Sequence, residues 1–177
     1  MEAVKRLADE GIDMTLQCVG AGDAEAAYKR QARALGIGNR IEFAGYVPRE
    51  KIAAFYGAAH VFVLPSQNEG MSVATLEAMA AGLPLIVTHT GGTAHLVEEG
   101  VNGWTFPWAD VQALTAHIRR LAIDRALARR MGAASRARAA QFSWGEAVTK
   151  YLRIFEKITA HSLHPLRGRS ALHRLEI

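Results

Sequence analysis

Short apolar segments alternate with helical patterns along most of this chain. The apolar segments are MTLQCVG (14–20), RIEFAGY (40–46), VFVLP (61–65), LIVTH (85–89) and GWTF (103–106). Strands that alternate with helices of about 10 to 15 residues form βαβ units, in which the strands run parallel and the helices cover the sheet. The sequence therefore predicts an α/β fold, a doubly wound Rossmann-like parallel sheet of about five strands with helices on both faces.

This domain is expected to cover residues 1–160. The last residues, 161–177, show no clear periodicity and carry several basic side chains, so we expect a disordered basic tail there. The chain opens directly into a helical pattern, MEAVKRLADEG, whereas doubly wound domains usually begin with a strand. We therefore expect further residues upstream of Met1 in the natural protein.

Composition excludes several classes of protein. The sequence has no apolar run long enough to cross a bilayer and no signal-peptide pattern, and its single cysteine, Cys18, cannot form an intramolecular disulfide. These features favour a cytoplasmic protein. No Cys/His cluster has zinc-ligand spacing, so we expect no metal site.

Arginines are concentrated in the C-terminal third and contribute to a net charge of +4. We interpret them as solvated helix faces, which are also compatible with peripheral contact at the inner face of the membrane. Nucleic acid is not an expected partner, because no helix-turn-helix, zinc finger or aromatic RNA-binding motif accompanies the charge.

Ligands of open parallel sheets bind beyond the carboxyl ends of the strands. Four predicted loops lie there: VGAGD (19–23), GYVPRE (45–50), PSQNEGMS (65–72) and THTGG (88–92). The third leads into a helix predicted over 71–81, whose first amides favour an anion such as phosphate. The dinucleotide-binding, nucleoside-triphosphatase and serine-hydrolase motifs are absent from the sequence, so those three classes are not favoured.

Two carboxylates flank the start of this helix. Glu69 precedes it, Glu77 lies in its middle, and the helical path from Met71 to Glu77 would rise about 9 Å. Carboxylates accept paired hydrogen bonds from the vicinal hydroxyls of a ribose or a hexose. The stretch can therefore hold phosphate between two sugars, although the same spacing is also frequent on ordinary surface helices.

The whole stretch PSQNEGMSVATLEAMAAGLPLIVT resembles the C-terminal, donor-binding domain of retaining glycosyltransferases of family four, also called glycosyl transferases group 1. These enzymes consist of two Rossmann-like domains, the GT-B architecture. Their signature is a Glu, seven residues and a second Glu. The resemblance extends to VGAGD, RIEFAGYVP and LVEEGVNGWTF, and it covers roughly residues 1–158.

The resemblance implies a role for each matching position. Glu69 is the implied catalytic-site residue and contacts the donor hexose, while Glu77 binds the ribose. The other implied donor-binding residues are Gly70, Met71, Ser72 and Val73 (amides facing sugar and diphosphate), Tyr46, Val47 and Arg49 (base pocket), and Gly20 and Gly22 (floor beside the diphosphate). This chain departs from the common Glu-Gly-Phe-Gly pattern at Met71 and Ser72.

The implied activity is retaining transfer of a hexose from a nucleotide-diphosphate donor, such as UDP- or GDP-hexose, to an acceptor hydroxyl, without metal or cofactor. An N-terminal Rossmann-like domain would supply the acceptor site, so the isolated chain is expected to be inactive. Two alternatives stay open: a nucleotide-binding module without transfer activity, and a flavodoxin-like regulatory or interaction domain.

Overall fold

The computed structural model describes residues 1–162 and divides the chain into two compact units, residues 1–140 and residues from 141 onward. The first unit contains five strands, β1 (Leu16–Val19), β2 (Ile41–Gly45), β3 (Phe62–Leu64), β4 (Leu85–Thr88) and β5 (Gly103–Phe106). Its α-helices are α1 (Glu2–Asp9), α2 (Glu25–Ala34), α3 (Arg49–Ala58), α4 (Val73–Ala81), α5 (Val111–Ile123) and α6 (Arg125–Ala139). Short 3₁₀ helices cover Gly38–Arg40, Thr93–His95 and Ala140–Phe142, and α7 (Trp144–Ser162) belongs to the second unit.

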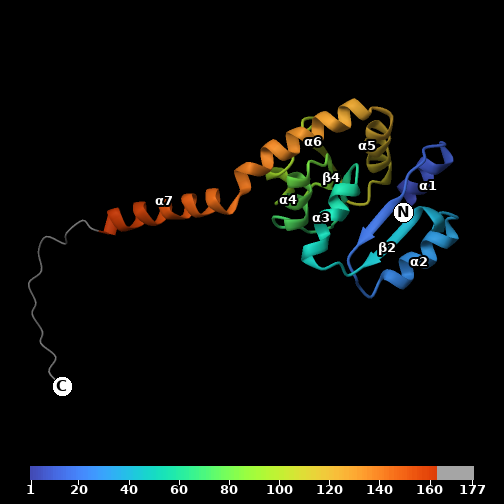
Figure 1. The fold of residues 1–177 in the computed structure, drawn as a ribbon, viewed down its shortest axis with the longest axis horizontal. Helices are drawn as coiled ribbons and strands as arrows, with labels where there is room; N and C mark the ends of the chain where they lie inside the picture. Colours follow the sequence, from blue (N-terminus) through green and yellow to red (C-terminus); the bar gives the residue numbers. More distant parts are fainter. Residues whose placement is uncertain (163–177) are drawn as a thin grey trace, which may run out of the picture. The chain divides into compact units, whose positions relative to one another are not determined.

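The prediction of five parallel strands alternating with helices is confirmed (Figure 1). The strands divide between two sheets, however, with the orders β1-β2 and β3-β4-β5. Within the described residues, β4 therefore pairs with a neighbour on both sides, and each of the other four strands pairs on one side only. All four residues of β4 are buried, three of the four residues of β5 are buried, and the three residues of β3 are half-buried.

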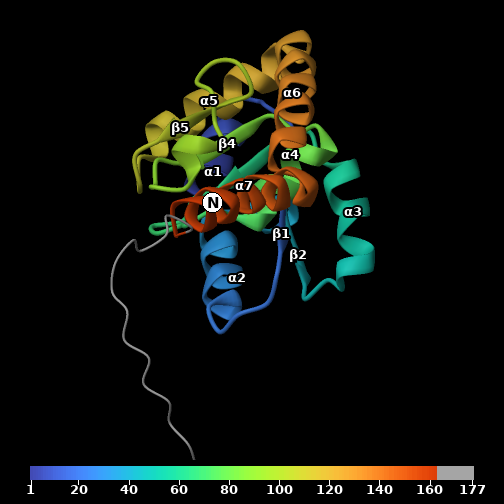
Figure 2. The same cartoon turned by 90° about the vertical axis from the view of Figure 1, so that its left-hand side faces the viewer.

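Helix α1 connects the two halves of the core. Its Ala3 and Leu7 belong to a cluster with Ile86 of β4, Trp104 of β5 and residues of α5 and α6. Val4, on the neighbouring face, packs instead with Ala32, Ile37 and Ile41 near α2 and β2. Figures 1 and 2 show α2 beside the β1–β2 pair and α3 beside α4, and the contacts between elements agree for the second pair.

The helix predicted over 71–81 begins two residues later, at Val73. Ser72 is its N-cap, because its hydroxyl accepts a hydrogen bond from the Thr75 amide at 3.2 Å, the role for which serine is strongly preferred. Gly82 ends the helix in the left-handed conformation, with φ of 82°. Met71 and Ser72 therefore lie outside the helix.

Several C-terminal arginines are not simply solvated. Arg138 donates to the carbonyl oxygens of Leu96 and His95, at 3.1 and 2.9 Å, and Arg136 donates to that of Ala81 at 2.9 Å. Arg120 lies over the Trp104 ring, 5.1 Å from its centroid. These side chains attach α5 and α6 to the rest of the first unit.

Two predictions concern the ends of the described chain and the membrane. Residues 163–177 of the predicted basic tail lie outside the described residues, and the extent of the domain as 1–160 stays a prediction. Among the described helices, none is long and apolar enough to cross a membrane.

His117 of α5 is expected to make the stability of the fold depend on pH. Its ring stacks on Trp104, with centroids 5.0 Å apart and planes 9° apart. Burial lowers the pKa of His117 below its usual 6.5, an effect that the Glu99 carboxylate opposes and the Arg120 charge reinforces. A histidine with a lowered folded-state pKa destabilises the fold as pH falls below its unfolded pKa.

We therefore expect the free energy of unfolding to decrease, by less than about 1 kcal/mol because the ring is partly solvated, between about pH 7.5 and 5.5. Urea unfolding at several pH values measures this, and His117→Gln should flatten the dependence. His60→Gln, at an exposed position, is the matched control. An unchanged slope in His117→Gln would contradict the prediction.

Candidate functional site

The loops that follow β3 and β4 are in direct backbone contact. A Cβ atom placed on Gly92 would lie 1.7 Å from the carbonyl oxygen of Gly70, so only a glycine fits there. Thr88, at the end of β4, donates its hydroxyl hydrogen to the Ser66 carbonyl, and Thr93 donates to the Thr88 carbonyl at 2.8 Å. Residues 65–72 and 89–92 thus form one rim at the carboxyl ends of these strands.

The N-terminus of α4 opens on this rim. The Ser72 side chain satisfies the Thr75 amide, whereas the amides of Val73 and Ala74 have no acceptor within residues 1–162. The side chains of Met71 and Val73 are 54% and 66% exposed. Free amides at the positive end of a helix dipole are suited to an anion.

Glu69 and Glu77 lie on either side of this helix start, and each has one oxygen held by a hydroxyl. Ser66 Oγ donates to Glu69 Oε1 at 3.3 Å, and Tyr56 Oη donates to Glu77 Oε2 at 3.1 Å. Both carboxylates are half-buried, and their second oxygens have no partner among the described residues. Each carboxylate therefore retains an oxygen that can accept a hydrogen bond from a ligand.

The helical segment that leads to Glu77 is shorter than the sequence-based expectation. Because α4 begins at Val73, the helical rise to Glu77 is about 6 Å, rather than the 9 Å or so expected for a helix from Met71. Glu69 lies in the loop, three residues before the N-cap, so the two acids are not on one helix.

The remaining predicted residues lie at the other pair of strands. The Gly20 amide donates to the Gly45 carbonyl at 2.8 Å, which joins the loop after β1 to the end of β2. Gly22 and Arg49 are exposed, Val47 is half-buried and Tyr46 is 78% exposed. In the part of the chain that the structure describes, no hydrogen bond connects these five to Glu69 or Glu77. The predicted site residues thus form two groups.

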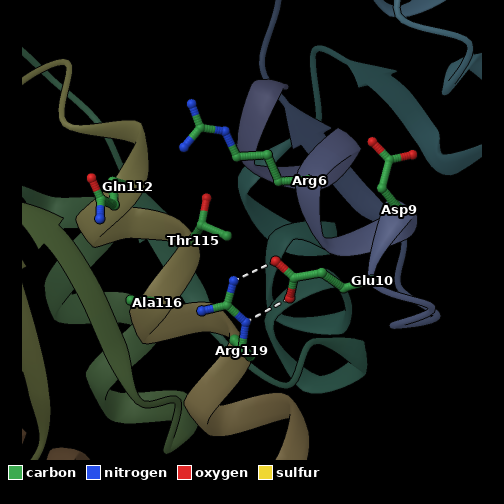
Figure 3. A pocket seen from close by; sticks show the side chains of 7 residues that line it. All are labelled: Arg6, Asp9, Glu10, Gln112, Thr115, Ala116 and Arg119. Carbon is green, nitrogen blue, oxygen red and sulfur yellow. Dashed lines mark hydrogen bonds and ion pairs between the residues drawn. The ribbon is translucent and has the colours of Figure 1, made fainter.

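A hollow between α1 and α5 is lined by residues that belong to neither group (Figure 3). Glu10 and Arg119 face each other across it, and Arg119 Nε donates to Glu10 Oε2 at 2.6 Å. This hydrogen bond lowers the pKa of Glu10, and the pair satisfies both charges. The hollow contains none of the predicted site residues, and its lining is Arg6, Asp9, Glu10, Gln112, Thr115, Ala116 and Arg119. It is a contact between two helices rather than the candidate site.

Sequence reasoning missed Tyr56, Ser66 and Gly92 as residues of the site. Ser66 and Gly92 stand within the loops that were expected to bind a ligand, and the Gly91–Gly92 pair was a visible signal of close backbone approach. Tyr56 gave no such signal, because it lies within α3, 21 residues from Glu77, and the contact depends on how α3 packs on α4. Across residues 1–162, no cluster of three His, Cys, Asp or Glu side chains has the geometry of a metal site.

A family model described as glycosyl transferases group 1 matches residues 1–138. The amylovoran biosynthesis glycosyltransferase AmsK of Erwinia amylovora is 35% identical over 127 residues, which are 68% of this chain and 31% of that protein. The D-inositol 3-phosphate glycosyltransferase of Streptomyces avermitilis is 34% identical over 151 residues, 85% of this chain and 32% of that protein. The chain thus spans about a third of the length of these curated relatives.

Solved structures agree with the fold. The crystal structure of Anabaena HepE in complex with UDP superposes with a TM-score of 0.75 at 27% identity, over 90% of this chain and 43% of that one.

Proposed function

Because this chain belongs to the glycosyl transferases group 1 family, we propose that it binds the nucleotide-sugar donor for transfer of a hexose to an acceptor hydroxyl. The fold is that of a Rossmann-like half of a GT-B enzyme. That HepE has been crystallised with UDP supports a uridine nucleotide as the first ligand to test. The rest of the activity would need the acceptor domain, since the chain spans 31% of the length of a relative such as AmsK.

One arrangement carries the proposal: the two partly free carboxylates on either side of the open N-terminus of α4. In this assignment the amides of Val73 and Ala74 receive the diphosphate, Glu69 accepts hydrogen bonds from the hexose and Glu77 from the ribose. Gly70, Met71 and Ser72 line the diphosphate from the loop side. Gly20, Gly22, Tyr46, Val47 and Arg49 would contribute the floor and the base pocket.

The chemistry that fits this arrangement is electrostatic. When the hexose leaves, negative charge develops on the diphosphate, and helix amides placed beside it stabilise that charge without reorganisation. Glu69 and Glu77 act in this proposal as binding groups. The proposal does not assign them as the acid/base pair of a glycosidase, which needs two carboxyls on one bond. Retention at the anomeric carbon is part of the same proposal.

Nucleotide binding should not depend on a divalent ion. The helix amides already supply positive potential to the diphosphate, so we expect the Kd for UDP to be the same within about twofold in Mg²⁺ and in EDTA. Isothermal titration of the 177-residue chain in both buffers measures this. Loss of binding in EDTA would contradict metal independence.

The roles of the two acids can be separated by their ligands. Glu77→Ala should weaken UDP and UDP-glucose alike, by about 10- to 100-fold, because the ribose is common to both. Glu69→Ala should raise the Kd for UDP-glucose by a similar factor and change the Kd for UDP by less than about twofold. The substitution removes only the contact to the hexose, which UDP does not carry. GDP and GDP-mannose form a second pair of probes.

The alternatives predict other outcomes. A nucleotide-binding module would bind both ligands and show no transfer activity of its own. A flavodoxin-like interaction domain would bind neither nucleotide, and Glu77→Ala would then have no effect. Equal losses for UDP and UDP-glucose in Glu69→Ala would refute the assignment of Glu69 to the hexose.

A further inference from the structure

Tyr56 of α3 reaches across to α4 and contacts the middle of that helix. Its hydroxyl donates to Glu77 Oε2 at 3.1 Å and lies 3.3 Å from the Ala74 carbonyl oxygen. Its ring packs against Phe62 of β3, with centroids 6.2 Å apart and planes tilted by 54°. The phenol is therefore held at its ring by the sheet and at its hydroxyl by α4.

This contact leaves Glu77 with one fixed oxygen and one free oxygen. A glutamate side chain on a helix surface samples several rotamers, and fixing it on binding costs conformational entropy. The hydrogen bond from Tyr56 already restricts the Glu77 side chain in the free protein, so less entropy is lost when a ligand binds. Glu77 Oε1, which has no partner in the described part of the chain, then has a defined direction.

We propose that Tyr56 is a positioning residue that orients the Glu77 carboxylate toward the vicinal hydroxyls of the donor's ribose, and so makes the site select ribonucleotides over 2′-deoxyribonucleotides. The inference rests on the proposed function, in which Glu77 binds the ribose. It adds a residue of α3, and a preference for the sugar of the nucleotide, to the site on α4.

The direction of the hydrogen bond is fixed by protonation. Burial, together with the charge of Glu77 and the hydrogen bond to it, raises the pKa of Tyr56 to about 12. The phenol therefore stays protonated throughout the neutral range, and Glu77 Oε2 at 3.1 Å is the nearer of its two acceptors, the other being the Ala74 carbonyl oxygen at 3.3 Å. A phenylalanine at this position would keep the ring against Phe62 and remove only the donor.

The test is isothermal titration of the 177-residue chain and of Tyr56→Phe with UDP and 2′-deoxy-UDP, or with GDP and 2′-deoxy-GDP if guanosine nucleotides bind more tightly. We expect the preference for the ribonucleotide to fall by about three- to tenfold in Tyr56→Phe, with the deoxynucleotide Kd unchanged within about twofold. A merely structural role would weaken both ligands equally. Tyr28→Phe, at an exposed position of α2, is the matched control and should keep the full preference.

The outcomes separate the inference from the proposed function. If neither nucleotide pair binds the wild-type chain, both are wrong. If the wild type prefers ribose and Tyr56→Phe keeps that preference, the inference is wrong while the proposed function stands. Glu77→Gln should abolish the preference, and adding Tyr56→Phe to it should cause no further loss if the two residues act together.

A second measurement applies even if Tyr56→Phe fails to fold. Ultraviolet titration of phenolate, in rapid alkaline jumps, should show the Tyr56 step moving to lower pH in Glu77→Gln, because the charge and the acceptor are removed. An unmoved titration would show that the two side chains are not in contact, which would overturn the inference.

Discussion

Gly92→Ala should strongly weaken the binding of a nucleotide sugar by this chain. The added Cβ would lie 1.7 Å from the Gly70 carbonyl oxygen, 2.1 Å from the Gly70 carbonyl carbon and 2.7 Å from the Met71 nitrogen, all of them backbone atoms. Gly92 itself has φ of −81° and ψ of −31°, a conformation open to alanine. The effect is therefore purely steric, and the loops of residues 69–72 and 89–92 cannot both keep their positions.

The displacement affects both the amides and the acid that the donor would contact. We expect the Kd for UDP-glucose to rise by at least about 100-fold, and the free energy of unfolding to fall by about 2–4 kcal/mol. Isothermal titration and urea unfolding measure the two effects.

The neighbouring glycine provides a control of the same chemistry. A Cβ on Gly91 would meet nothing within 4 Å, so Gly91→Ala should change the unfolding free energy by less than about 0.5 kcal/mol and leave binding intact. Equal effects at the two positions would mean that the loops after β3 and β4 are not in contact. Wild-type affinity in Gly92→Ala would mean that the donor does not use residues 69–72.

Local patterns were enough to predict the elements of the fold. The apolar run at 61–65 contains β3, and the helix predicted to end at residue 81 and the strand predicted to start at residue 85 do so in α4 and β4. The start of α4 was placed two residues early, because an apolar Met71 fits a helical period as well as it fits a loop, and the capping role of Ser72 was not used. The division into two sheets could not be predicted, since strand pairing is set by contacts between distant segments.

For the candidate site as well, groups within one stretch of chain could be predicted and contacts between distant segments could not. Glu69, Glu77 and the loop between them could be predicted as site residues because their spacing and their surroundings form a recognisable pattern along one stretch of chain, and their donor-binding roles stay predictions. The hydroxyls that hold the two acids were not found. Tyr56 contacts Glu77 across the α3–α4 packing, and the contact between Gly92 and Gly70 joins loops that are 22 residues apart in sequence. Such contacts leave no local periodicity.

Gly132→Ala tests how α4 is held at its other end. Gly132 lies in the middle of α6, where replacing glycine by alanine normally stabilises a helix by about 1 kcal/mol. Here a Cβ would lie 2.2 Å from the Gly82 carbonyl oxygen and 3.6 Å from Pro84 Cδ, because α6 crosses closely over the end of α4. Distances below 3.0 Å are essentially never observed for a Cβ, so α6 must shift.

The shift would strain the other contacts that hold α6 in place. Arg136 donates to the Ala81 carbonyl at 2.9 Å, and Ser135 donates to the Asn102 carbonyl at 3.2 Å, both within a turn of Gly132. Overpacking against backbone costs about 1–3 kcal/mol, and losing these bonds adds to it, so the steric term outweighs the helix-propensity gain. We expect Gly132→Ala to lower the free energy of unfolding by about 2–4 kcal/mol, as measured by urea unfolding.

Gly57→Ala, also a glycine-to-alanine change in a helix, should raise the free energy of unfolding rather than lower it. Gly57 is an exposed residue of α3, and a Cβ there would meet nothing within 4 Å. Only helix propensity and the entropy of the unfolded chain then act, and the variant should be more stable by about 0.5–1 kcal/mol. If Gly132→Ala were also stabilising, α6 would not pack against Gly82 as closely as described. The position of α4, and of the amides at its N-terminus, would then depend on contacts other than this helix crossing.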